Sequence, residues 1–119
     1  MSYAIIALVT AIGTLGLGSI FMFSSSTILK QWGLQSSENV QVVSRRLGAV
    51  YLGVSTLFFL SITSIPATNA IAIGAAVMSA LLAITGIVEL QAGRVNKGII
   101  RSIVIELLLS LVLLSTLLN

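Results

Sequence analysis

The chain has 119 residues, of which 57% are hydrophobic and 8% are charged, and its mean hydropathy is +1.15. Soluble domains carry charged side chains at about 25% of their positions, so these proportions exclude a water-soluble globule. The sequence has no cysteine, histidine or aspartate, which removes disulfides, thiol catalysis, iron–sulfur ligation and the commonest metal and haem ligands. We therefore expect an integral membrane protein that binds no cofactor or metal and is not an enzyme.

Four apolar runs follow one another along the chain, each close to the ~20 residues that a helix needs to cross a bilayer. Strands do not fit, because the runs are too long and too evenly apolar to alternate with period two. The second helix begins before its apolar run, near Ser36 or Ser37, where Glu38 supplies an acidic first turn. The sequence predicts one all-α domain, a membrane-embedded four-helix bundle with spans at about 3–23, 40–65, 69–90 and 98–118.

The cations all lie in or beside two of the three connections between these spans. They are Lys30, Arg45, Arg46, Arg94, Lys97 and Arg101. The opposite side, with both termini and the connection around Pro66, has no Lys or Arg. The positive-inside rule therefore predicts a multi-pass protein of the inner (plasma) membrane, with both termini on the non-cytoplasmic side. So few cations, without interleaved aromatic residues, do not favour nucleic-acid binding.

Small residues spaced four apart mark the surfaces through which helices pack in lipid. Each predicted span carries one such stripe, which favours a compact bundle, and a ligand cavity between the stripes is the alternative interpretation. The stripes are Thr10, Thr14 and Gly18; Gly48, Ala49 and Gly53; Ala75, Ser79 and Ala83; and Gly98, Ser102, Glu106 and Ser110.

Glu106 is the most informative residue, because it is the eighth residue of the last apolar run and lies ~10–12 Å below the membrane surface. A carboxylate at that depth costs at least ~2–3 kcal/mol unless it is paired, protonated or in contact with water. Arg45 lies above the small face of the second helix, so we expect a buried Arg45–Glu106 ion pair, direct or through Ser102 or water, with Ser110 on the same stripe. The pair either fixes helix register or lines a polar cavity in which Glu106 takes up a proton.

Other polar residues are expected at the membrane surface. Glu89, near the end of the third span, is within reach of Arg94 or Arg101 and predicts a solvated ion pair. Lys30 and Trp32 form an amphipathic patch at headgroup level, where an aromatic residue anchors the chain or contacts a partner protein.

Three short motifs resemble small bacterial four-helix membrane proteins of the DoxX-like group. They are Gly18 followed by Trp32-Gly33-Leu34, RRLGAVYLG at Arg45–Gly53, and IELLL at Ile105–Leu109. Many members have a basic residue late in the third helix, where this chain has Glu89. The resemblance implies the four-helix bundle and the cytoplasmic loops, and it brings no established activity.

Since almost no residues lie outside the spans, the sequence favours a structural, accessory or interaction subunit that binds membrane lipid between its helices. Its expected partners are further copies of the chain or a larger membrane complex. The alternative is a small proton-coupled transporter of a hydrophobic or cationic molecule that uses Glu106. An enzyme acting on lipid or quinone would have only Glu106, Arg45 and scattered hydroxyl groups for its chemistry.

Overall fold

The computed structural model describes residues 2–118, and these residues form five α-helices and one short 3-10 helix without any strand. Four of these helices are long and apolar enough to cross a membrane, the last counted together with the 3-10 helix. The prediction of an all-α fold with four helices apolar enough to cross a membrane is therefore confirmed. The elements are α1 (Tyr3–Phe23), α2 (Ser25–Gln31), α3 (Glu38–Ser61), α4 (Ala67–Gln91), α5 (Ile99–Ser115) and η1 (Thr116–Leu118).

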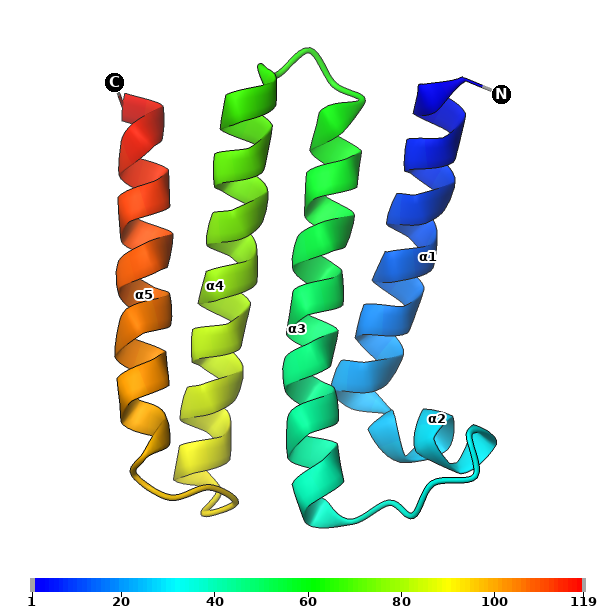
Figure 1. Cartoon of the computed structure of the whole chain (residues 1–119), viewed down its shortest axis with the longest axis vertical. Helices are drawn as coiled ribbons and strands as arrows, with labels where there is room; N and C mark the ends of the chain where they lie inside the picture. Colours follow the sequence, from blue (N-terminus) through cyan, green and yellow to red (C-terminus); the bar gives the residue numbers. More distant parts are fainter. Residues whose placement is uncertain (1, 119) are drawn as a thin grey trace.

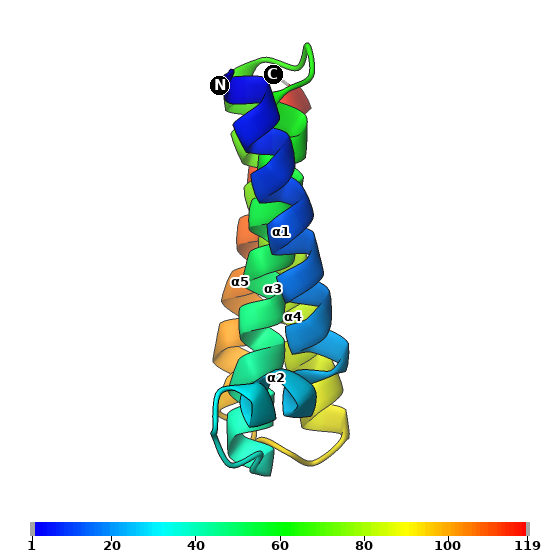
Figure 2. The same cartoon turned by 90° about the vertical axis from the view of Figure 1, so that its right-hand side faces the viewer.

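The four long helices lie side by side in a single layer, in the order α1, α3, α4, α5 (Figures 1 and 2). The layer measures 42 × 35 × 13 Å, and within residues 2–118 the backbone of α1 approaches those of α2 and α3 but not those of α4 and α5. The predicted compact bundle is therefore wrong in its packing.

The reason for the layer is that the inner helices carry small residues on two sides. In α3, Gly48 meets α1 and Gly53 meets Met78 of α4. In α4, Gly74 meets Leu57 of α3, while the carbonyl of Ala76 accepts a hydrogen bond from α5. Residues two apart on a helix point about 200° apart, so the two neighbours of α4 lie on opposite sides of it.

Helices α1 and α3 approach each other most closely at two glycines. A Cβ atom at Gly18 would lie 3.0 Å from the carbonyl oxygen of Gly48, and one at Gly48 would lie 2.8 Å from that of Gly18. Ser55 of α3 adds a hydrogen bond of 2.7 Å to the carbonyl of Ala11. Gly18 thus packs as its stripe predicted, whereas Thr14 of the same stripe donates within α1, to the carbonyl of Thr10 at 2.8 Å.

The connections divide the molecule into two ends. Helix α2 and residues 92–98 lie at one end, and both termini lie with residues 62–66 at the other (Figure 1). Helix α3 begins where the sequence predicted, because the side chain of Ser37 accepts a hydrogen bond from the backbone N–H of Val40. It ends at Ser61, a turn earlier than the predicted boundary at residue 65, and Pro66 precedes the first residue of α4.

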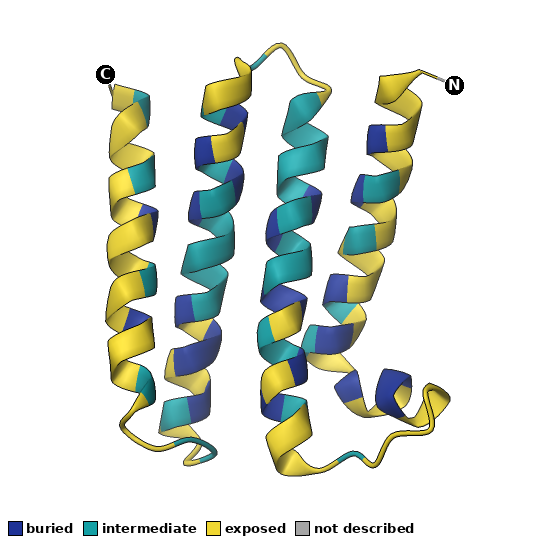
Figure 3. Cartoon of the chain, in the orientation of Figure 1, coloured by how far each residue is buried: buried dark blue, intermediate teal, exposed yellow. Residues whose placement is uncertain are grey.

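Burial is concentrated on α3, α4 and the inner side of α1 (Figure 3). Most of the buried residues are small, which allows the backbones of neighbouring helices to come close. On α5 only Ile103 and Ser110 are buried, so this helix presents most of its leucine and isoleucine side chains outward. In a bilayer such a surface suits lipid or a neighbouring chain.

Candidate functional site

The first group of charged residues, which we name the Glu89 cluster, consists of Arg45, Glu89 and Arg94. The side chain of Glu89 is 1% exposed, and its two oxygens accept from Nε of Arg45, from Nη2 of Arg45 at 3.1 Å, and from Nε of Arg94. The arginine side chains are 20% and 30% exposed. The cluster therefore joins α3, α4 and the turn that follows α4.

The turn after α4 brings Arg94 back onto Glu89. Gly93 has a φ of 75°, a left-handed conformation that glycine adopts without steric cost. The backbone N–H of Arg94 then donates to the carbonyl of Glu89, and that of Gly93 donates to Leu90, which is the Schellman arrangement at a helix end. The sequence Glu89-Leu-Gln-Ala-Gly-Arg94 thus positions its own arginine over its own carboxylate.

The second group, the Glu106 cluster, consists of Arg46 and Glu106. Nη2 of Arg46 donates to Oε1 of Glu106, and Nη1 donates to the carbonyl of Leu82 at 3.0 Å. Arg46 therefore reaches from α3 across α4 to α5. Oε2 of Glu106 is buried and has no hydrogen-bond partner among the described residues.

Gly86 makes this crossing possible. A Cβ atom at this position would lie 3.2 Å from Nη1 of Arg46 and 2.9 Å from Cγ1 of Ile103 on α5. Both distances are too short for an ordinary contact, so a side chain at position 86 would push Arg46 or α5 away from α4.

The predicted ion pair between Arg45 and Glu106 is wrong, because Arg45 pairs with Glu89 and the next residue, Arg46, pairs with Glu106. Adjacent residues on a helix point about 100° apart, so the two arginines serve different partners. The prediction assumed a bundle in which the second and fourth spans face each other, whereas α4 lies between them. Ser102 is exposed, and no hydrogen bond joins its side chain to the described residues.

Ser110 is buried as expected, but it donates to the carbonyl of Ala76 at 3.0 Å and so ties α5 to α4 away from the ion pairs.

Among the interfacial residues, Arg94 is a partner of Glu89 as predicted. The carboxylate is buried instead of solvated, because Arg45 encloses it from α3. Arg101 is exposed and makes no ion pair within residues 2–118.

Trp32 and Lys30 lie at the α2 end of the molecule, as do the two charged clusters. Trp32 is 56% exposed and its ring meets that of Phe21 edge-on, with 5.5 Å between the centroids. Phe21 in turn stacks on Tyr51 of α3 at 5.7 Å. These rings fix the connection to α1 and α3, while Lys30 remains exposed. The sequence singled out Trp32, but it contained no signal for the Phe21–Tyr51 contact.

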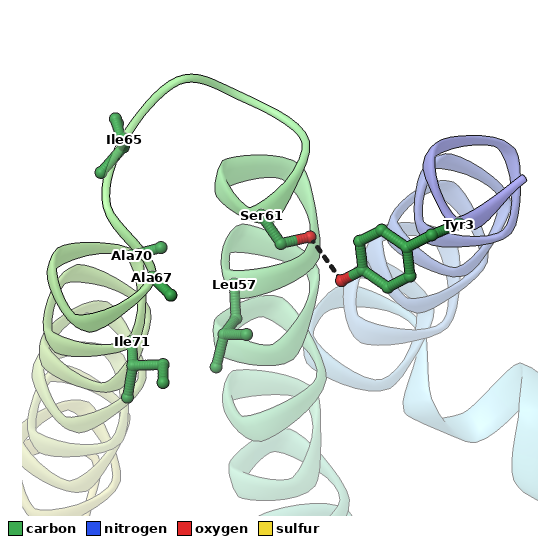
Figure 4. Close-up of a pocket in the computed structure, with 7 residues that line it drawn as sticks. All are labelled: Tyr3, Leu57, Ser61, Ile65, Ala67, Ala70 and Ile71. Carbon is green, nitrogen blue, oxygen red and sulfur yellow. Dashed lines mark hydrogen bonds between the residues drawn. The ribbon is translucent and has the colours of Figure 1, made fainter.

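A cavity of about 380 Å³ adjoins the Glu89 cluster, between the end of α1 and the facing turns of α3 and α4. Its lining residues are Met22, Phe23, Arg45, Ile84, Thr85, Val88 and Glu89. A second cavity, of about 370 Å³, lies at the end with the termini, where the hydroxyl of Tyr3 donates to Oγ of Ser61 at 2.8 Å (Figure 4). Only the first of these two cavities is bordered by charged side chains.

The part of the chain that the structure describes has no group of three or more carboxylate, histidine or cysteine side chains that could hold a metal ion. Comparison with protein-family models, with curated proteins and with solved structures gives no match. The chemistry available is that of two arginine–carboxylate clusters and an apolar cavity beside one of them.

Proposed function

We propose that this chain is a non-enzymatic subunit of a membrane assembly, formed by further copies of the chain or by other membrane proteins, with lipid bound between its helices. The observation that carries the proposal is the single layer of helices. Charged side chains in membrane proteins normally face the interior of a bundle. In this layer, Arg46 and Glu106 keep 23% and 14% of their side chains exposed, so a neighbouring chain or lipid headgroup is needed to cover them.

The roles of the two carboxylates support the same proposal. Glu89 accepts hydrogen bonds from two arginines, and Oε1 of Glu106 accepts one from Arg46. Both groups therefore hold helices together, as expected for a structural protein. The position of the six cations at the α2 end supports an inner-membrane protein with that end in the cytoplasm and the termini outside. Because three short motifs resemble those of the DoxX-like group, we propose that the chain belongs to that family.

The absence of cysteine from the sequence allows a direct test. A single cysteine introduced by Gln35→Cys, in the exposed connection between α2 and α3, would carry one fluorophore per chain. We expect particles extracted in native lipid to show two or more bleaching steps, or a second polypeptide in fixed proportion. Particles with one step and no second polypeptide, at every protein density, would contradict the proposal.

A proton-coupled transporter is the second candidate, and the observation that favours it is the unpartnered Oε2 of Glu106. A buried carboxylate oxygen without a donor is a site where a proton can bind. Its test is the uptake of tetraphenylphosphonium, a hydrophobic cation, into proteoliposomes with an imposed proton gradient. Transport by the wild-type chain that is lost in Glu106→Gln would support this candidate, and identical uptake by both would remove it.

A further inference from the structure

The cavity beside the Glu89 cluster has an almost wholly apolar surface, and the charged groups of the cluster lie at its edge. Met22 and Phe23 of α1 and Ile84 and Val88 of α4 supply the apolar side chains, and Arg45 borders the cavity from α3. Its volume of about 380 Å³ falls within the range of roughly 300–1,000 Å³ that is typical of small-molecule sites. These residues belong to the last turns of α1 and α4 and the first turns of α3, so the cavity lies toward the end of the layer that carries α2 (Figure 1).

The charges of the cluster do not balance. Two guanidinium groups share the single carboxylate of Glu89, which leaves one net positive charge beside the cavity. The other two carboxylates of the chain do not compensate it: Glu106 pairs with Arg46, and Glu38 makes no ion pair within residues 2–118. An uncompensated charge in a partly apolar environment favours the binding of an anion.

The arginines also have free donors. A guanidinium group carries five N–H bonds in a planar fork. Arg45 uses Nε and Nη2 on Glu89, and Arg94 uses Nε. Within residues 2–118, Nη1 of Arg45 and both terminal nitrogens of Arg94 have no acceptor. Glu89 holds the two side chains in place from its buried position. Paired guanidinium groups fixed in this way suit the oxygens of a phosphate group.

We propose that this site binds an anionic phospholipid, with its phosphodiester on Arg45 and Arg94 and one acyl chain in the cavity lined by Met22, Phe23, Ile84 and Val88. The inference rests on the proposed function, since it names the lipid class that lies between the helices. Basic pockets between membrane helices are known sites for anionic headgroups. A lipid is favoured over free phosphate because the cavity next to the arginines is apolar and opens among membrane-spanning helices.

The test measures lipid binding to the delipidated full chain by native mass spectrometry. Phosphatidylglycerol is compared with phosphatidylcholine of the same acyl chains and with inorganic phosphate. We expect phosphatidylglycerol to bind at least about tenfold more tightly than phosphatidylcholine, because one unbalanced charge and several charge-assisted hydrogen bonds distinguish the two. Equal binding of the two lipids would overturn the role of the charge. Competition by inorganic phosphate at the same concentration would overturn the role of the acyl chain.

Two variants locate the site. Arg94→Gln should lower the affinity for phosphatidylglycerol about tenfold, whereas Arg101→Gln, which removes an exposed arginine of the same end that makes no described ion pair, should leave it unchanged. Val88→Phe should fill the cavity and weaken the binding of both lipids without changing the charge. Equal effects of Arg94→Gln and Arg101→Gln, in chains of unchanged helical content, would place the lipid elsewhere.

The lipid-binding experiment and the count of bleaching steps test different proposals, so one can fail while the other succeeds. A chain that assembles but does not distinguish the two lipids contradicts only this inference. A chain that stays alone yet selects phosphatidylglycerol contradicts only the role as a subunit.

Discussion

The two ends of the molecule are held together by different forces. The α2 end carries all six cations and three ion pairs, and one of its carboxylates is fully buried. The end with the termini has no Lys, Arg, Asp or Glu side chain, and a hydrogen bond between Tyr3 and Ser61 links α1 to α3 there. One end thus carries the charged side chains and the ion pairs that join neighbouring helices. The other relies on small residues and hydroxyl groups.

The largest effect should come from Glu89→Gln. The substitution removes the negative charge that pairs with both Arg45 and Arg94, and it places an amide NH₂ group against guanidinium donors. Removing one partner from a buried ion pair costs about 3 kcal/mol or more. Unfolding by dodecyl sulfate in mixed micelles, followed by circular dichroism, measures the loss. Glu38→Gln, at a carboxylate without a described ion pair, is the control, and equal losses in both would remove the distinction between the two ends.

A smaller effect is expected for Gly86→Ala at the crossing of Arg46. The new methyl group would lie 2.9 Å from Ile103 and 3.2 Å from Arg46, so α5 or the arginine must shift. Relative to an alanine placed in open space on a helix, overpacking of this kind costs about 1–3 kcal/mol. Gly16→Ala is the matched control, since nothing lies within 4 Å of its Cβ position, and it should be neutral or stabilising by up to about 1 kcal/mol. The same unfolding assay measures the change in stability of both variants. Similar changes for the two would show that the contact between Arg46 and Glu106 does not require Gly86.

Glu106→Gln should cost less than Glu89→Gln, about 1–2 kcal/mol. The glutamine keeps an acceptor for Arg46, and Arg46 keeps the carbonyl of Leu82. Oε2 of Glu106 has no partner to lose among the described residues. A double-mutant cycle with Arg46→Gln isolates the pair. A loss as large as that of Glu89→Gln would mean that the two clusters contribute equally.

The smallest effect belongs to the uncharged end. Tyr3→Phe removes the single hydrogen bond to Ser61, and both residues are accessible, so we expect a loss of about 0.5 kcal/mol. Ser61→Ala should cost slightly more, because the serine hydroxyl also donates to the carbonyl of Phe58 at 2.7 Å. A loss of several kcal/mol in Tyr3→Phe, in the same assay, would place a main structural contact at the end with the termini.

The sequence was enough to predict which residues form helices and which connections lie at the same end of the molecule, because both depend on local composition. The start of α3 follows from Ser37, and the position of Arg94 beside Glu89 follows from five residues of chain. The choice between Arg45 and Arg46 as partner of Glu106 could not be made in this way. It depends on whether α3 faces α5 directly or across α4, and that depends on contacts between distant parts of the chain.

The same limit applies to the serines of α5. Spacing alone placed Ser102 and Ser110, which are eight residues apart, on one stripe. Only Ser110 is buried, since α5 packs on α4 alone among the long helices that the structure describes, and Ser102 does not face it. In a closed bundle both would have been covered, so the error lies in the assumed number of neighbours and not in the helix itself.

The reach of Arg46 across Gly86 has a consequence for the order of synthesis. Ribosomes deliver the chain from its N-terminus, so Arg46 enters the bilayer before α4 and α5 exist. The Leu82 carbonyl gives it a first acceptor, and Glu106 arrives last, carried by the helix with the least buried surface. Arg46 is thus in place before α5 is made. When Glu106 follows, its pairing with Arg46 lowers the cost of inserting a carboxylate with the final helix.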